Sequence, residues 1–392
     1  MISRRILISG LCLAFWAAAA VAADWPCYLG ANRDNTSADK SLKLWSGDTA
    51  KVLWKKNVGT GYSSMAVAGR KLYTQGQGTV WCLDAETGDT AWRWPADGKG
   101  KGGETTATPA IDDGLVFALA PNHTIVCLDA AKGQLQWSVK VDEFKVKQGG
   151  WALSCSPLVL GDNVIMDLGV VFVLDKKTGK LVWKAGSETA GYASAVVFPR
   201  GSDKLVTSFN GAGLAIYNMA AGEPVANYPW ETAFGVNSAT PIVSGDKIFI
   251  SSGYGRGCSL LKLDGGALKK VWENKKMNNH CQTCVLADGC LYGVHGQQAQ
   301  KASVKCLDFE TGEVKWEQKG LPVGGGLTLA DGKLFVMLDG GALLVAEASP
   351  KGFKELARAT VLEGQCWTVP VVANGRVYCR SHAGELVGLD LR

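Results

Sequence analysis

Short stretches in which apolar and polar residues alternate recur along the whole chain and predict a protein built from β-strands. Alternation with a period of two puts one face of a strand in the core and the other toward solvent. Pairs of such stretches meet at turns that contain Gly, in most copies beside Asp or Asn: residues 67–73, 111–117, 159–165, 243–249, 286–292, 329–335 and 372–378. These residues favour tight turns. The pattern therefore predicts antiparallel hairpins rather than helices.

A second pattern repeats between the hairpins: Leu-Asp, with Trp eight residues after the Asp and, in most copies, Gly four residues after it. Five copies have both ends, at Asp84/Trp92, Asp129/Trp137, Asp175/Trp183, Asp264/Trp272 and Asp308/Trp316. Degenerate copies at Asn218, Glu347 and Asp390 bring the spacing to 39 to 46 residues throughout. A period of this length with short strands is typical of propeller blades. We predict an all-β, eight-bladed β-propeller with four-stranded antiparallel blades.

The residue types of this motif predict how the blades join. Asp begins a tight turn by accepting hydrogen bonds from the backbone ahead, and Gly takes the left-handed conformation that closes it. Trp supplies a wide apolar face that can cover the neighbouring blade. We therefore expect six tryptophans to dock one blade on the next: Trp54, Trp92, Trp137, Trp183, Trp272 and Trp316.

The two ends of the chain predict how the ring closes. The last copy ends at the strand-like residues 385–392 with no outer strand behind it, and a strand-like stretch at 52–58 precedes the first copy. We expect residues 52–58 to complete the last blade. Proline recurs at one phase of the first strand of a blade, and because proline lacks a donor, that strand should be the innermost edge. These residues are Pro109, Pro157, Pro241 and Pro370.

The N-terminal residues predict export. Arg4 and Arg5 precede a short apolar run that ends in small residues, which is the shape of a secretory signal cleaved near Ala23. The run is short for a bilayer, so we expect no transmembrane anchor. We assign 1–23 to the signal peptide, 24–50 to an N-terminal extension and 51–392 to the propeller domain.

Charge then narrows the classes of partner. Without the two signal arginines, the mature chain has 39 basic and 36 acidic residues. This balance favours neither a nucleic acid nor a membrane surface as partner. We expect a periplasmic or secreted monomer.

The motif LD-x-x-x-G-x-x-x-W, the turns AETG, KKTG and FETG, and the opening DWPCYLGANRD resemble the pyrroloquinoline-quinone (PQQ) repeat of exported propellers in the quinoprotein alcohol dehydrogenase-like superfamily. The resemblance covers roughly residues 24–392. It implies either a PQQ-dependent alcohol or sugar dehydrogenase or a scaffold such as the BamB-like subunit of the outer-membrane assembly machinery. By the same resemblance, Glu104 and Asn237 are oxygen ligands for a calcium ion beside PQQ.

Several parts of the dehydrogenase site are missing from the sequence. There are no two adjacent cysteines, no Trp-Asp dipeptide and no Cys-x-x-Cys-His. No nucleophile elbow occurs either. We therefore expect no catalytic residue, and we favour a non-catalytic binding or scaffold module over the alternative, a dehydrogenase with a reduced PQQ and calcium site.

A cluster of histidine and cysteine invites a zinc hypothesis, which strand geometry opposes. Cys281 and Cys284 fall in a predicted strand, where three residues span about 10 Å and side chains alternate between faces. We expect no metal site there. Other cysteines share one strand phase and are expected to be small buried apolar residues: Cys82, Cys127 and Cys306.

Counting along the first strand of each blade gives one position per blade that should ring the mouth of the channel. These positions are Tyr62, Thr106, Ser154, Tyr192, Ser238, Cys281, Gly324 and Trp367. Histidines 123, 280, 295 and 382 fall in loops of the same face. Loops on a rigid scaffold are where binding residues concentrate.

From this ring and the loops beside it we predict a ligand-binding set: Tyr62, Trp151, Tyr192, Asn237, Arg256, His280 and Trp367. Flat aromatic side chains beside a cation and hydrogen-bonding groups suit a small planar or anionic ligand, or a peptide of an envelope protein. The alternative is a water-filled mouth whose aromatic residues pack on their own blades.

Overall fold

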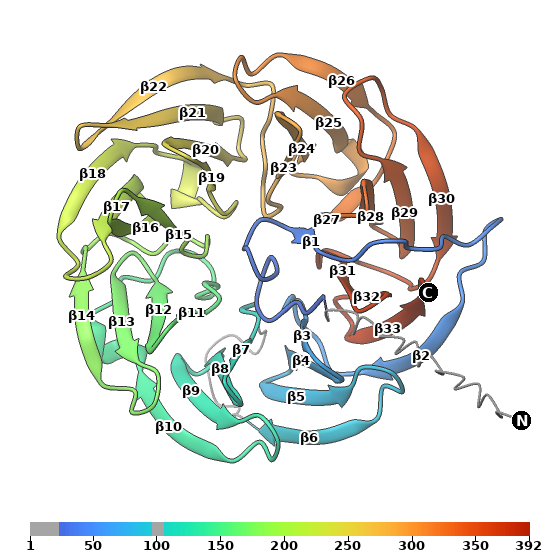
Figure 1. Ribbon diagram of the computed structural model, residues 1–392, viewed down its shortest axis with the longest axis horizontal. Coiled ribbons are helices and arrows are strands. Elements are labelled where there is room, and N and C mark those ends of the chain that lie inside the picture. Colours follow the sequence, from blue (N-terminus) through green and yellow to red (C-terminus); the bar gives the residue numbers. More distant parts are fainter. Residues whose placement is uncertain (1–22, 96–105) are drawn as a thin grey trace, which may run out of the picture.

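The computed structural model describes residues 23–95 and 106–392. Figure 1 shows eight antiparallel sheets arranged like blades around one axis, each with four blade strands. This confirms the predicted eight-bladed propeller. The described residues contain no helix that is long and apolar enough to cross a membrane. Residues 1–22 of the predicted signal peptide, and Glu104, lie outside the described residues.

Each blade runs outward from a short inner strand. Blades 1 to 4 comprise β3 (Ala66–Ala68), β4 (Lys71–Gly76), β5 (Thr79–Asp84) and β6 (Thr90–Pro95); β7 (Ala110–Asp112), β8 (Leu115–Ala120), β9 (Thr124–Asp129) and β10 (Leu135–Lys140); β11 (Leu158–Leu160), β12 (Asn163–Asp167), β13 (Val171–Asp175) and β14 (Leu181–Ala185); and β15 (Val197–Arg200), β16 (Asp203–Asn210), β17 (Gly213–Asn218) and β18 (Pro224–Pro229). The two middle strands of a blade are almost wholly buried, because neighbouring blades cover both of their faces.

The second half of the ring repeats this order. Blades 5 to 8 comprise β19 (Ile242–Ser244), β20 (Lys247–Ser252), β21 (Gly257–Asp264) and β22 (Ala267–Asn274); β23 (Val285–Ala287), β24 (Cys290–His295), β25 (Ser303–Asp308) and β26 (Val314–Gln318); β27 (Val323–Ala330), β28 (Lys333–Leu338), β29 (Ala342–Glu347) and β30 (Glu355–Thr360); and β31 (Val371–Ala373), β32 (Arg376–Arg380) and β33 (Glu385–Asp390) with β2 (Val52–Asn57). Three short 3₁₀ helices lie in the connections: η1 (Val141–Phe144), η2 (Ala233–Gly235) and η3 (Ala299–Lys301).

Strand β2 closes the ring as predicted. It pairs antiparallel with β33, so that the N-terminal strand is the outermost strand of the last blade. In Figure 1, β2 runs along the outside of β33. Trp54 of β2 then occupies the position that Trp92 has in the first blade.

The innermost strands are shorter than the sequence predicted. Most have three residues, and the four prolines stand immediately before the strand rather than within it. The prediction that Cys281 and Cys284 lie in a strand is wrong: both precede β23. The residues before the inner strands bond to neighbouring blades instead of their own hairpin, as Thr240 N–H does to Thr283 Oγ1 at 3.0 Å. The strand-phase cysteines are buried: Cys82, Cys127 and Cys306.

Tryptophans of the outer strands join the blades. A β-bulge precedes Trp92 in β6 and turns the side chain toward the next blade. Its Nε1–H donates to the Ala130 carbonyl at 2.9 Å, and its ring lies against Gly133. The same contact recurs around the ring, with Nε1 donating from Trp54 to Ala85, Trp137 to Lys176, Trp183 to Met219, Trp272 to Phe309 and Trp316 to Ser349.

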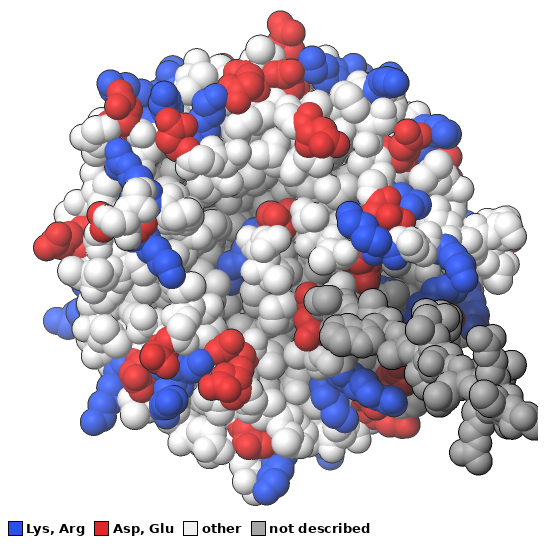
Figure 2. Space-filling view, viewed as in Figure 1, with Lys and Arg blue, Asp and Glu red and all other residues white. Residues whose placement is uncertain are grey.

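Residues 24–37 form a plug inside the ring, and residues 38–50 run outward over blades 7 and 8 to β2 (Figure 1). Strand β1 (Thr36–Ser37) pairs parallel with the inner edge of β27, and Trp25, fully buried, exchanges backbone hydrogen bonds with Val67 of β3. Carbonyls of Pro26 and Asn35 accept from blades 2 and 7. Figure 1 shows this segment crossing the middle of the ring. Viewed in the same direction, Lys and Arg side chains intersperse with Asp and Glu, without a large area of one sign (Figure 2).

Candidate binding site

A cavity of about 390 Å³ lies at the centre of the ring, among the loops that lead into the inner strands. Seven of the eight predicted ring positions line it, from Tyr62 to Trp367, and Gly325 and Gly326 line it in blade 7 in place of Gly324. The plug and the residues that follow it bond to the turns at the other end of the inner strands, as Asp39 does to Gly375 N–H. The cavity therefore opens on the loop face, and we call it the loop-face cavity.

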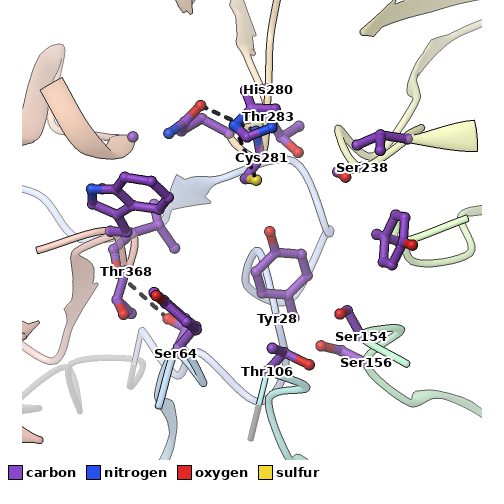
Figure 3. Close-up of a pocket in the computed structure, with 18 of the residues that line it drawn as sticks. Tyr28, Ser64, Thr106, Ser154, Ser156, Ser238, His280, Cys281, Thr283 and Thr368 are labelled. Atoms are coloured by element: carbon purple, nitrogen blue, oxygen red, sulfur yellow. Dashed lines mark hydrogen bonds between the residues drawn. The ribbon is translucent and has the colours of Figure 1, made fainter. Parts of the chain in front are cut away.

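The plug supplies the floor of this cavity. Tyr28 and Asn35 both line it, and Figure 3 shows the Tyr28 ring standing in the middle with its hydroxyl directed toward Cys281. No hydrogen-bond partner for this hydroxyl occurs in the part of the chain that the structure describes. Burial raises the pKa of Tyr28 to about 12, so the phenol is uncharged at neutral pH. Sequence reasoning missed both residues, because it relied on positions that repeat from blade to blade and the plug segment has no such repeat.

Aromatic side chains form two walls. On one side, rings follow one another from Trp151 through Phe234 and Tyr254 to His280, with centroid distances of 6.1, 5.7 and 5.4 Å. Trp151, Tyr254 and His280 line the cavity, and Phe234 lies beside them outside the lining. Tyr192 meets Trp151 edge-on at 6.0 Å. Trp151 is 50% exposed and Phe234 73% exposed. The backbone of Phe234 has a φ of 63°, a left-handed conformation that is strained for a residue with a side chain.

The other aromatic wall comes from blades 8 and 1. Tyr62 stacks on His382 with a centroid distance of 4.5 Å and lies 6.3 Å from Trp367. Its hydroxyl donates to Gln365 Oε1 at 3.3 Å. Together the two walls bring five of the seven predicted ligand-binding residues into one cavity: Tyr62, Trp151, Tyr192, His280 and Trp367.

The structure gives the remaining two predicted residues other partners. Asn237 is buried and uses its amide to join Asn210 O, Trp230 O and Ser252 Oγ. The Arg256 guanidinium lies 3.4 Å from the Trp230 ring centroid and pairs with Glu273 at 2.9 Å. Neither side chain lines the cavity. Both stabilise the loops of blades 4 and 5 behind the aromatic wall.

Six Ser and Thr residues stand two positions after the ring positions, and sequence reasoning did not single them out as a set. In five consecutive steps the backbone N–H of one donates to the hydroxyl oxygen of the next: Ser64 to Thr108, Thr108 to Ser156, Ser156 to Ser194, Ser194 to Thr240 and Thr240 to Thr283. Three of them, Ser64, Ser156 and Thr283, line the cavity. We call this set the hydroxyl belt. Ser and Thr at matching positions just before successive inner strands were the signal that would have revealed it.

His280 and Cys281 lie together at the cavity wall. The His280 Nδ1 and Cys281 Sγ atoms are 3.6 Å apart. Surrounding protein lowers the pKa of His280 and raises the pKa of Cys281 to about 11, in both cases by desolvation. Of the eleven cysteines in the described residues, which are all free thiols, Cys281 is the exposed one. A neutral imidazole and a protonated thiol do not form an activated nucleophile.

The lining does not fit the PQQ and calcium that the fold family implies. PQQ carries several carboxylates, and calcium prefers carboxylate oxygens. Neither a carboxylate nor an Arg or Lys belongs to the cavity lining that the structure describes. Within the described ranges, no three His, Cys, Asp or Glu side chains are grouped so as to hold a metal ion. Asn237, the described member of the calcium pair, lies outside the lining, and its Oδ1 accepts from Ser252 Oγ.

Eight blades around a lined central cavity, with tryptophan contacts at six of the eight junctions, define a β-propeller of the PQQ-repeat class. The chain belongs to the family described as outer membrane protein assembly factor BamB, which matches residues 38–202, 103–318 and 300–392.

Curated relatives carry the same family name. BamB of Moranella endobia (strain PCIT) is 24% identical over 228 residues, which are 55% of this chain and 53% of that protein. BamB of Burkholderia pseudomallei (strain K96243) is 30% identical over 194 residues, 46% and 45% of the two chains. The chain thus spans about half the length of these relatives.

Solved structures share the fold. BamB from Moraxella catarrhalis superposes with a TM-score of 0.67 at 18% identity, covering 88% of this chain and 98% of that one. Quinohemoprotein alcohol dehydrogenase from Comamonas testosteroni superposes with a TM-score of 0.76 at 12% identity, covering 94% and 80%. At these identities the similarity is one of fold.

Proposed function

We propose that the protein is a non-catalytic binding module of the cell envelope, which holds a segment of an envelope protein or a small ligand in the loop-face cavity. One observation carries the proposal: aromatic and hydroxyl side chains from all around the ring converge on one cavity whose described lining has no charged group. Such a lining favours the binding and orientation of a ligand, and the His280–Cys281 pair within it is not an activated nucleophile.

Membership of the BamB family supports a scaffold role. The relatives are named as assembly factors of the outer membrane, and the predicted signal sequence would bring this chain to the periplasm. We propose that it acts there as a monomer. The alternative is a PQQ-dependent dehydrogenase. The similarity of fold to quinohemoprotein alcohol dehydrogenase favours it, but no residue of the described lining matches a PQQ or calcium site.

The first test measures capture at the cavity. A photo-crosslinking residue at position 151 should trap a partner in the intact envelope, and the Tyr62→Ala, Trp367→Ala double variant should fold normally but lose that capture. Trp45→Ala, outside the cavity, serves as the control and should retain it. Capture that survives in the folded double variant would place the site elsewhere.

A second test addresses the dehydrogenase alternative. PQQ and calcium are added to the purified chain, and dye-linked oxidation of simple alcohols and sugars is followed together with PQQ binding. We expect neither stoichiometric binding nor turnover. Binding with turnover would reverse the order of the two functions.

A further inference from the structure

We infer that the loop-face cavity takes a neutral, hydroxyl-rich ring compound, namely one or two sugar units of a glycan. The inference rests on the proposed binding function and narrows its ligand. Three properties of the cavity lead to it: the absence of charge in the described lining, the pair of aromatic walls, and the hydroxyl groups between them.

The charge of the lining argues against anions and metal ions. An anion bound in a desolvated site needs a cation or several aligned donors, and a metal ion such as calcium needs carboxylate oxygens. The nearby guanidinium groups serve the protein itself: Arg256 pairs with Glu273, and Arg380, fully buried, donates to the carbonyls of Ser63, Gly59 and Gln75. Asp167 is also buried, and its carboxylate accepts from Ser208. None of these groups reaches the lining.

The titratable groups of the cavity are uncharged at neutral pH as well. Desolvation lowers the pKa of His280, and it raises the pKa of Tyr28 and of Cys281 to about 12 and about 11. The phenol, the thiol and the imidazole therefore act as neutral hydrogen-bonding groups. They suit a ligand that has both donors and acceptors and no net charge.

The aromatic walls suit a ring with an apolar face. A sugar ring presents C–H groups on its face and hydroxyls on its edge, so a flat aromatic side chain packs against the face while the edge stays free to hydrogen-bond. Trp151 lines the cavity, is 50% exposed and meets the exposed Phe234 edge-on at its side. Its indole is therefore a large flat surface that a sugar face can cover.

The hydroxyls between the walls complete the match. Tyr28 Oη and Ser238 Oγ line the cavity, and neither has a hydrogen-bond partner within the described part of the chain. A hydroxyl both donates and accepts, as each sugar hydroxyl does. A flat aromatic ligand without hydroxyls would fill the space but leave these groups desolvated and unpaired, which costs binding free energy.

The size of the cavity limits the length of the ligand. Its volume of about 390 Å³ is near the lower end of the range for small-molecule pockets, about 300–1,000 Å³. This space suits the end of a glycan rather than its middle, because Tyr28 and the plug close the inner side. The occupant would therefore enter from the loop face.

The test uses the mature chain and four kinds of probe. Tryptophan fluorescence and calorimetry follow titration with neutral disaccharides (maltose, cellobiose and N,N′-diacetylchitobiose), with galacturonate, with glucosamine and with PQQ. We expect a neutral disaccharide to bind more tightly than the charged probes. Trp151→Ala should weaken that binding about tenfold, the equivalent of about 1.4 kcal/mol. Tyr28→Phe, which removes one hydroxyl, should weaken it by about threefold to tenfold.

Controls make each outcome decisive. Trp45→Ala, which leaves the cavity intact, should bind like the parent chain, and equal weakening in Trp45→Ala and Trp151→Ala would overturn the assignment. Tighter binding of galacturonate, glucosamine or PQQ at Trp151 would overturn the neutral ligand while leaving a binding function in place. Failure of every probe in a chain that still crosslinks a partner from position 151 would likewise overturn only the sugar inference. Loss of both would overturn the proposed function too.

Discussion

The indole ring of Trp92 lies flat against Gly133 of the following blade. A Cβ atom on Gly133 would lie 2.6 Å from two atoms of that ring, and the same residue has a φ of +68°. Glycine is therefore required there for two separate reasons: the left-handed turn and the room for the tryptophan. This relationship explains why Asp, Gly and Trp recur together along the chain, since the Gly of one blade receives the Trp of the blade before it.

The double role of this glycine predicts an unequal response to alanine. Gly114 has a φ of +74° but nothing within 4 Å of its would-be Cβ, so Gly114→Ala tests backbone strain alone. We expect it to lower the free energy of unfolding by about 1–2 kcal/mol. Gly133→Ala should cost about 1–3 kcal/mol more, because the methyl group also displaces Trp92. Equal losses in urea denaturation would contradict the docking role of Gly133.

The docking contact itself is tested by removing a tryptophan. Trp137 donates to Lys176 O at 2.9 Å and packs on Gly179. We expect Trp137→Ala to lower the free energy of unfolding by about 3–5 kcal/mol. Trp45 lies outside the repeat and its indole N–H has no partner within the described residues, so Trp45→Ala should cost less. Matching losses for the two variants would refute the inter-blade role.

Closure of the ring predicts the effect of a truncation. Deleting residues 24–58 removes β2 and leaves the edge of β33 unpaired, which favours aggregation because an open edge pairs with other chains. Deleting residues 24–45 removes the plug but keeps β2, and that chain should stay monomeric. Size-exclusion chromatography with thermal melting measures both. A monomeric 24–58 deletion with unchanged melting would rule out this closure.

Asp167 predicts a dependence of stability on pH. Burial raises the pKa of this carboxyl from its ordinary 3.8 to about 6. The folded state therefore holds the proton more tightly than the unfolded state, and stability falls as pH rises from about 4 to about 6, then levels. As pH rises through that window, the free energy of unfolding of Asp167→Asn should increase relative to that of the parent by up to about 3 kcal/mol. Urea denaturation across the window measures this, and a constant difference would argue against the shift.

The propeller could be predicted because its constraints repeat. Each blade needs the same turn and the same docking contact, so Asp84, Gly88 and Trp92 find counterparts in later blades and an error in reading one copy is corrected by the others. Ring positions such as Tyr62 and Trp367 followed from the same register. The innermost strands were predicted too long. The residues before them bond to a neighbouring blade instead of their own hairpin, and the pattern of apolar and polar residues does not distinguish the two kinds of bonding.

The floor and back of the site could not be predicted in the same way. Backbone hydrogen bonds between the plug and several blades position Tyr28. Such bonds can form with almost any residue type, so the sequence does not reveal them. Arg256 stands in a loop of the expected face, but its guanidinium turns to Trp230 and Glu273, which come from two other segments. The direction of a side chain in a loop that occurs only once depends on tertiary contacts, and a repeated sequence pattern does not predict these.

The pairing of Val52 with Leu389 has a consequence for the time course of biogenesis. A chain that emerges from the ribosome presents β2 near the start and β33 at the end, so the two strands that close the ring are separated by most of the period of synthesis. Contacts between such distant segments form late. Until the C-terminus is released, the nascent chain is an open arc, and a chaperone or a protease that acts in that interval meets two unfinished ends at once.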